Sequence, residues 1–174
     1  MSINENLAFG LYQNQPENKN NLFSTRFRMM VKRLPNTTYM CQAVSLPGLS
    51  IDITRQATPF NAIKRPAGEV KHENIVVDFI VDENLENWKE IRNWILQCSN
   101  YENHELYRPQ SEHFSDDVLL TILTNTHNIS HKIQFSSCFP VSLSSIRFDS
   151  SSQQTEIILA TVELAFTTYD IKTE

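Results

Sequence analysis

The segment that most constrains the fold lies near the C-terminus and reads TEIILATVELAFTTYD, residues 155–170. Every second position is apolar without interruption: Ile158, Ala160, Val162, Leu164 and Phe166. The opposite face is mixed: Ile157, Leu159, Thr161, Glu163, Ala165, Thr167 and Tyr169. Alternation with a period of two predicts a β-strand that buries one face.

The length of this segment is a further constraint. About fifteen residues at ~3.3 Å each would span roughly 50 Å, whereas an ordinary strand has five or six residues. Such a strand does not fit inside a lone small sandwich. Either the strand bends, or part of it lies in a larger sheet shared among chains.

Most of the remaining chain also alternates as strands do. The expected strands are LFSTRFRMMVKR (22–33), TTYMCQAVSLPG (37–48, with Tyr39, Cys41 and Ala43 on one side), LSIDITRQ (49–56), VKHENIVVDFIVDE (70–83), DVLLTILTN (117–125) and NISHKIQFSSC (128–138). We expect Ile75, Val77 and Phe79 to share a buried face. The pattern predicts a mainly β protein, an antiparallel sandwich or open barrel.

One helix is expected, over NLENWKEIRNWILQCSN, residues 84–100. Its apolar side chains recur three and four apart, and they are Leu85, Trp88, Ile91, Ile95 and Cys98. Asn84 is a candidate N-cap, and Trp94 widens the apolar stripe. We therefore expect the helix to flank the sheet with both tryptophans packed against it.

The chain has 174 residues, of which 40% are hydrophobic and 20% charged, which suits one folded domain. We divide it into a polar, Asn-rich N-terminal arm (1–20) that orders by docking, and a β domain (21–174). The arm lacks the apolar core of a signal peptide. No run of about 18 apolar residues is present, so no membrane anchor is expected.

Charge is unevenly distributed. The net charge of −5 argues against a protein that grips DNA by neutralising phosphates. Five basic residues nevertheless occur between positions 19 and 33 without an acidic one: Lys19, Arg26, Arg28, Lys32 and Arg33. This stripe is either a solvated strand face or a surface that meets an acidic stripe on a neighbouring molecule.

Signals for chemistry are absent. Cys41, Cys98 and Cys138 are isolated, which favours reduced thiols and assembly in a cytoplasm. The five histidines lack the spacing of a metal site, and with three glycines in the chain there is no Gly-rich phosphate loop. No nucleophile motif is present. We expect neither enzymatic activity nor a cofactor.

The stretch ATPFNAIKRPAGE (57–69) is expected to be a loop because it contains two prolines and a glycine. Phe60 and Ile63 are apolar residues in this stretch, between Pro59 and Pro66 and beside Lys64 and Arg65. Such a stiffened apolar finger either folds back over its own core or contacts another chain. The residues alone leave both alternatives open.

The order of these motifs resembles the tail tube proteins of contractile-tailed, T4-like phages. NLF is followed by CQAVSLPG, an extended loop that ends in AGE, the helix WKEIRNWI, the stretch FSSCFPVSLS and the long last strand. The resemblance covers residues 21–169. It extends to the related domain of baseplate tube-initiation proteins and to the tube component of type VI secretion.

The resemblance implies a structural subunit of a tail tube in the virion, assembled in the host cytoplasm. Subunits would form a hexameric ring whose sheets join into one barrel, and rings would stack into a conduit for genome ejection. The extended loop, residues 54–72, would reach a neighbouring ring through Pro59, Phe60, Ile63, Lys64 and Arg65. The implied partners are further copies of the chain, the tail sheath protein, baseplate or initiator proteins, the tape measure protein and genomic DNA.

An acidic bore would not retain DNA phosphates, and Asp78 and Glu163 are the candidate lumen residues. Two alternatives to the main tube subunit stay open. One is a single-ring tube initiator or terminator of the same fold, which the N-terminal residues and an insert at 102–116 would suit. The other is a nucleic-acid-binding β-barrel that uses Arg26, Arg28, Lys32 and Arg33.

Overall fold

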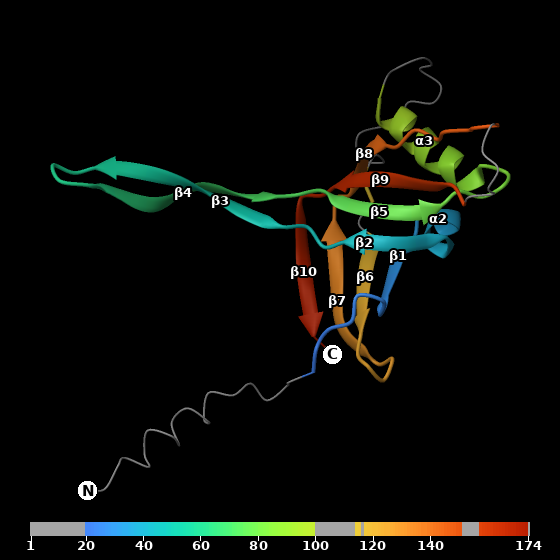
Figure 1. Ribbon diagram of the computed structural model, residues 1–174, viewed down its shortest axis with the longest axis horizontal. Helices are drawn as coiled ribbons and strands as arrows, with labels where there is room; N and C mark the ends of the chain where they lie inside the picture. Colours follow the sequence, from blue (N-terminus) through green and yellow to red (C-terminus); the bar gives the residue numbers. More distant parts are fainter. Residues whose placement is uncertain (1–19, 100–113, 116, 151–156, 174) are drawn as a thin grey trace, which may run out of the picture.

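The protein is described from a computed structural model, which covers residues 20–99, 114–115, 117–150 and 157–173 (Figure 1). Its strands form three antiparallel sheets. Sheet A has the order β1 (Phe27–Val31), β6 (Val118–Leu123), β7 (Ile129–Ser136), β10 (Thr168–Thr173). Sheet B has the order β2 (Cys41–Ser45), β5 (Ile75–Ile80), β9 (Leu159–Ala165), β8 (Phe139–Leu143). Strands β3 (Leu49–Ala57) and β4 (Ala62–His72) pair only with each other.

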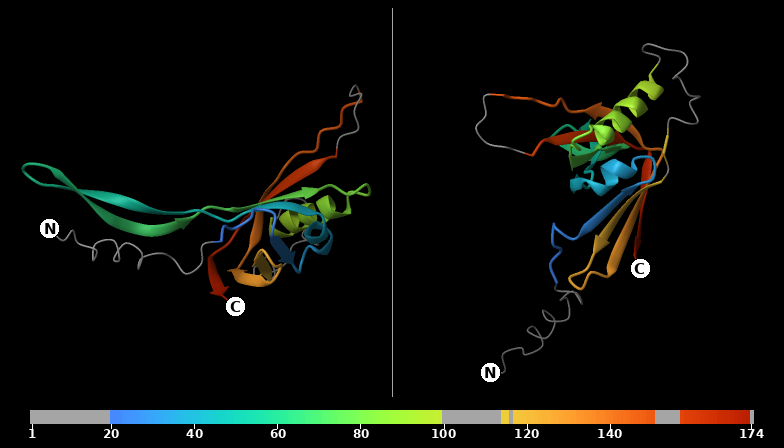
Figure 2. Two further views of the ribbon diagram at one scale, coloured as in Figure 1. Left: turned by 60° about the horizontal axis from the view of Figure 1, so that its bottom comes forward. Right: turned by 90° about the vertical axis from the view of Figure 1, so that its right-hand side faces the viewer.

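One apolar core lies between sheets A and B, whose strands cross each other (Figures 1 and 2). The predicted buried face of β5 is confirmed, because Ile75, Val77 and Phe79 are each at most 3% exposed. The predicted face of the last segment is confirmed by its central residues, Ala160, Val162 and Leu164, which are each 1% exposed. The mainly β, antiparallel prediction is therefore correct.

The long C-terminal segment bends. It leaves sheet B at the end of β9 and enters sheet A as β10, with Thr167 N–H donating to the Ser136 carbonyl at 3.1 Å. Phe166 lies at the bend, and its ring contacts those of Phe135 and Tyr169 at centroid distances of 5.1 and 5.7 Å. One continuous segment thus joins the two layers. Of the two alternatives for this long segment, a bend or a sheet shared among chains, the structure shows the bend.

The prediction of one strand over residues 37–48 is wrong for the first part of this segment. Residues Pro35–Tyr39 form a short helix, α2, and β2 begins only at Cys41. Proline at the first helical position fits this conformation, since its fixed φ suits a helix and its missing N–H would be unpaired there. Tyr39 therefore does not share a strand face with Cys41 and Ala43, and it is 85% exposed.

Helix α3 (Glu86–Cys98) confirms the single long helix, but its buried stripe differs from the predicted one. The buried residues are Asn87, Ile91 and Trp94, while Trp88 packs at the margin of the core. Asn84 does not cap the helix: residue 85 takes the N-cap position with φ 58° and no side-chain cap. The predicted stripe missed Asn87 because a polar residue is not expected in a core.

Asn87 joins the helix to the end of β5. Its side-chain amide donates to the Ile80 carbonyl at 2.7 Å, and its Oδ1 accepts from the N–H groups of Asp82 and Trp88 at 3.3 and 2.8 Å. Asn87 is fully buried, so water does not reach these backbone groups to take over its hydrogen bonds.

Replacing Asn87 with Leu should lower the free energy of unfolding by about 2–4 kcal/mol, because buried donors and acceptors lose their partner. Urea unfolding followed by circular dichroism measures the change. Asn84→Leu is the matched control and should change stability by less than about 0.5 kcal/mol, since this asparagine is exposed. Equal effects from the two substitutions would contradict the role assigned to Asn87.

The predicted N-terminal arm, except for Asn20, lies outside the described residues, as does most of the insert at 102–116. No helix within the described ranges has the length and apolar character needed to span a bilayer.

Candidate functional site

Residues 49–72 form a long antiparallel hairpin that projects away from the body of the domain (Figure 1). We call it the projecting hairpin. The prediction of a loop over 57–69 is wrong, because β4 extends through most of this range and only residues 58–61 connect the strands. Proline and glycine suggested irregular backbone, yet in a two-stranded sheet each strand has a free edge where Pro66 is tolerated.

The turn of the hairpin is held by Thr58 and Asn61. Thr58 N–H donates to the Asn61 carbonyl at 3.0 Å, Asn61 N–H donates to Thr58 Oγ1 at 3.2 Å, and Ala62 N–H donates to Asn61 Oδ1 at 2.8 Å. Phe60 lies in this turn and is 100% exposed. The alternative in which the finger folds back over its own core is thereby excluded.

The two faces of the hairpin differ. The pairing of Leu49 with His72, Ile51 with Val70 and Ile53 with Pro66 places apolar side chains together on one face. Asp52 lies on the other face and forms an ion pair with Lys71 at 2.8 Å. The register shifts between Ile51 and Ile53, and Gly68 absorbs the shift with φ +94°, a conformation that other residues rarely adopt.

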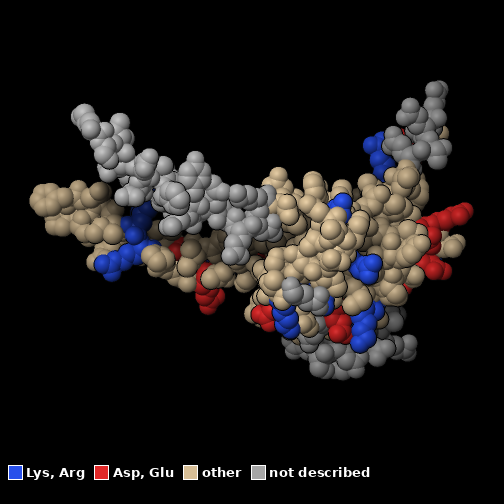
Figure 3. All heavy atoms as spheres, turned by 90° about the horizontal axis from the view of Figure 1, so that it is seen from below, with Lys and Arg blue, Asp and Glu red and all other residues tan. Residues whose placement is uncertain are grey.

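Charge is also segregated along the hairpin. Its outer part carries only basic residues, Arg55, Lys64 and Arg65, while the part nearer the body carries Asp52 and Glu69 together with Lys71 (Figure 3). Ile63 belongs to β4 opposite Gln56, on the face away from Ile53, and is 50% exposed. The predicted contact residues are thus split between the turn (Pro59, Phe60) and a strand (Ile63, Lys64, Arg65).

A two-stranded hairpin is at best marginally stable in water. This one also exposes five large apolar side chains along its strands, between 50% and 61% each: Leu49, Ile51, Ile53, Ile63 and Val70. Such a surface marks a site of protein contact. The hairpin therefore has the properties of a segment that is completed by a partner.

The second candidate surface is the face of sheet B that points away from the core. Asp78 and Glu163 both lie on it, since their neighbours Val77 and Val162 are buried on the other face. Asp78 Oδ1 accepts a hydrogen bond from Thr161 Oγ1 at 2.7 Å, and Glu163 accepts one from the Asn74 amide at 3.4 Å. The structure thus places both predicted lumen residues on one face.

This face has only one sign of charge. Strands β2, β5, β8 and β9 contain no lysine and no arginine, so Asp78 and Glu163 are their only charged side chains. Cys41 lies on the edge strand β2, which pairs with β5, and the negative charge of Asp78 on β5 acts on its thiol. Burial, and after it the negative charge of Asp78, raises the pKa of the Cys41 thiol to about 11. Cys41, Cys98 and Cys138 form no disulfide with one another.

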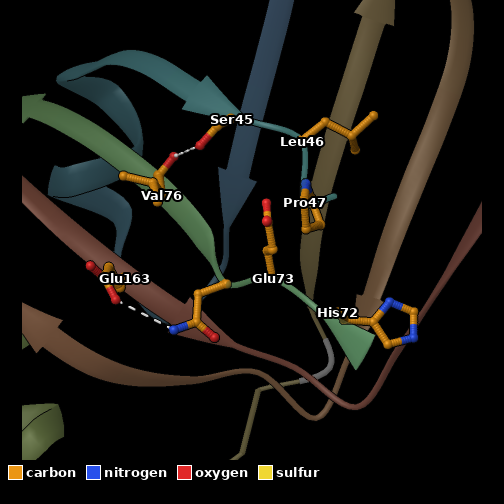
Figure 4. A pocket seen from close by; sticks show the side chains of 8 residues that line it. Ser45, Leu46, Pro47, His72, Glu73, Val76 and Glu163 are labelled. Atoms are coloured by element: carbon orange, nitrogen blue, oxygen red, sulfur yellow. Dashed lines mark hydrogen bonds between the residues drawn. The ribbon is translucent and has the colours of Figure 1, made fainter. Parts of the chain in front are cut away.

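A hollow of about 410 Å³ lies where the hairpin joins the body (Figure 4). It is lined by Ser45, Leu46, Pro47, His72, Glu73, Asn74, Val76 and Glu163. The Glu73 side chain points toward the segment that carries Ser45 and Pro47, and Glu163 lies across the hollow (Figure 4). Sequence reasoning missed this hollow, because its walls come from β2, β5, β9 and the root of the hairpin.

The predicted basic stripe does not form a single surface. The Arg26 guanidinium donates to the carbonyls of Thr124 and Asn125, and that of Arg33 lies over the Trp94 ring at 4.8 Å. Lys32 pairs with Asp117 at 3.2 Å, and Arg28 lies exposed on β1. Lys19 is outside the described residues. Within the described ranges, no cluster of His, Cys, Asp or Glu could hold a metal ion.

These features define the class of fold: a two-sheet β-sandwich with a flanking helix, open sheet edges and a projecting hairpin. A sequence model of the phage tail tube protein family matches residues 10–172. The chain belongs to the phage tail tube protein family. The resemblance seen in the order of its sequence motifs is confirmed.

The chain is 27% identical to the tail tube terminator protein of Enterobacteria phage T4. The alignment spans 139 residues, which is 78% of this chain and 78% of the T4 protein. Its fold is similar to that of the tube-terminating cap of the anti-feeding prophage, with a TM-score of 0.65 and 18% identity over 93% of this chain and 97% of that one. It is also similar to a chain of the sheath/tube terminator of the extracellular contractile injection system PVC, with a TM-score of 0.61 and 20% identity over 89% and 99%.

A chain of the PVC sheath–tube complex in its extended state is similar too, with a TM-score of 0.63 and 18% identity over 90% of this chain and 94% of that one. These structural likenesses show the fold. They span both terminators and a sheath–tube complex, so the fold by itself does not separate these roles.

Proposed function

We propose that this chain is a tail tube terminator, a non-enzymatic structural protein of the virion tail that closes the growing end of the tube. The observation that carries the proposal is the 27% identity to the T4 tail tube terminator over most of both proteins. This relationship favours the terminator, which was an alternative in the sequence analysis, over the main tube subunit. The nucleic-acid-binding alternative loses support because Arg26 and Arg33 are engaged within the chain.

Ring formation fits the open edges of sheet B. Strands β2 and β8 are its edge strands, and an edge strand presents unpaired backbone groups to another chain. Pairing β2 of one copy with β8 of the next would extend sheet B around a ring. Closure of the ring removes the edges, and we propose the hexameric form that the family resemblance implies.

A terminator and a tube subunit differ in what they do to a tube. Added to purified tail tubes, the gold-labelled protein should bind one end of each tube and stop further growth. Negative-stain electron microscopy of the labelled tubes measures this. Long tubes formed by the purified protein alone would show a main tube subunit instead.

The projecting hairpin is the proposed contact with the adjoining ring, through Phe60 and Ile63 together with Pro59, Lys64 and Arg65. Phe60→Asp combined with Ile63→Asp should abolish binding to tube ends, because charged groups would replace apolar contact area. The melting temperature of the domain should not change, since both residues lie outside the core.

The matched control is Ser50→Asp with Thr54→Asp, which adds the same charge to exposed positions of the same hairpin. End binding by this control should persist. If the Phe60 and Ile63 variant binds tube ends as well as the control does, the hairpin does not make the contact.

The outer face of sheet B is the proposed lining of the bore. Its carboxylates, repeated around a ring, would repel DNA phosphates so that the genome and the tape measure protein pass without being held. Glu163→Lys should slow genome ejection, measured as DNA release from purified particles triggered in vitro. Glu83→Lys, an equal charge change on an exposed loop, should leave the rate unchanged. Equal rates for the two variants would remove Glu163 from the bore.

The remaining partners follow from a position at the tube end. We propose the tail sheath protein as a neighbour and assembly in the host cytoplasm. Baseplate or initiator proteins would lie at the other end of the tube and have no direct contact with a terminator. Immunogold labelling of whole particles should mark only the head-proximal end of the tail.

A further inference from the structure

The outer face of sheet A is the counterpart of the acidic face of sheet B, on the opposite side of the core. The strand register aligns Arg28, Thr121, Lys132 and Lys172 in one row across the four strands. The next row is Met30, Leu119, Gln134 and Asp170. Lys132 of β7 and Lys172 of β10, far apart in the sequence, thus join Arg28 of β1 on one surface.

A groove of about 410 Å³ runs over this face. It is lined by Met30, Lys32, Asp117, Val118, Leu119, Lys132, Gln134 and Lys172. Met30 lies on the edge strand β1 and is 49% exposed, and Leu119 of β6 lies beside it in register. The groove therefore has an apolar floor and a rim with three lysines, of which Lys32 forms an exposed ion pair with Asp117 at 3.2 Å.

The chemistry of the groove favours protein over nucleic acid. Basic side chains outnumber acidic ones on this face, which attracts an acidic partner. A phosphate backbone, however, would gain nothing from Met30 and Leu119, and it would be repelled by Asp117 and Asp170. A protein segment with carboxylates around an apolar side chain matches both the rim and the floor.

We propose that the outer face of sheet A is a docking surface for an acidic segment of a partner protein, which seats an apolar side chain on Met30 and Leu119. Carboxylates of the segment pair with Lys32, Lys132 and Lys172. Because sheets A and B turn opposite faces to solvent, this contact is independent of the projecting hairpin and of the acidic face. The proposal also holds whether the chain ends the tube or builds it.

Fluorescence anisotropy with a short labelled peptide of glutamates interrupted by leucines tests the proposal. Polyglutamate and single-stranded DNA of equal length serve as comparison probes. The triple variant Lys32→Gln, Lys132→Gln, Lys172→Gln should weaken binding of the glutamate–leucine peptide about tenfold. The matched triple variant Lys89→Gln, Arg92→Gln, Arg147→Gln changes the net charge equally at exposed sites elsewhere, and it should bind as the wild type does.

Met30→Ser separates the floor from the rim. It should weaken binding of the glutamate–leucine peptide severalfold and leave polyglutamate binding unchanged, because only the former has an apolar side chain to seat. Equal binding of the glutamate–leucine peptide by the two triple variants would overturn the proposal. So would tighter binding of DNA than of the peptide, if the lysine triple variant loses the DNA binding. Salt-sensitive self-association that the lysine triple variant abolishes would instead make this face a contact between copies.

Discussion

A hairpin without a core must obtain its stability from whatever it contacts, and this requirement shapes the rest of the molecule. Among the strands that the structure describes, β3 and β4 pair only with each other, and their large apolar side chains are at least half exposed. The sandwich behind them is complete by contrast, with a closed apolar core and a fully bonded asparagine between helix and sheet. The molecule thus consists of a body with its own apolar core and an extension without one.

The body is closed by a single long segment that serves both layers. Because β9 and β10 are consecutive, the bend at Phe166 connects sheet B to sheet A without an intervening loop. The rings of Phe135, Phe166 and Tyr169 pack at this corner, and His72 at the root of the hairpin contacts two of them at 5.4 and 5.7 Å. The hairpin therefore starts from a corner of the sandwich where aromatic rings pack together.

The exposed faces of the two sheets differ in the charge of their side chains. The exposed face of sheet B carries Asp78 and Glu163 without a basic residue, whereas the exposed face of sheet A carries more basic residues (Arg28, Lys132 and Lys172) than acidic ones (Asp170). A subunit with opposite faces of opposite sign can offer one surface to a passing polyanion and the other to an acidic protein. No catalytic arrangement is required for such a role, because positioning and electrostatics suffice.

Local alternation determined the main elements, since a strand with one buried face must repeat every two residues; hence Ile75, Val77, Phe79 and the core of β9 were predictable. The same logic placed Asp78 and Glu163 opposite the buried face. Sequence could not show that Asn87 is buried, that residues 62–72 form a strand, or that Lys132 and Lys172 join Arg28. Those facts depend on which strands pair and where a chain reverses, and pairing is decided by contacts between residues far apart in the sequence. Periodicity therefore determined the faces, and only the tertiary structure decided which faces share a surface.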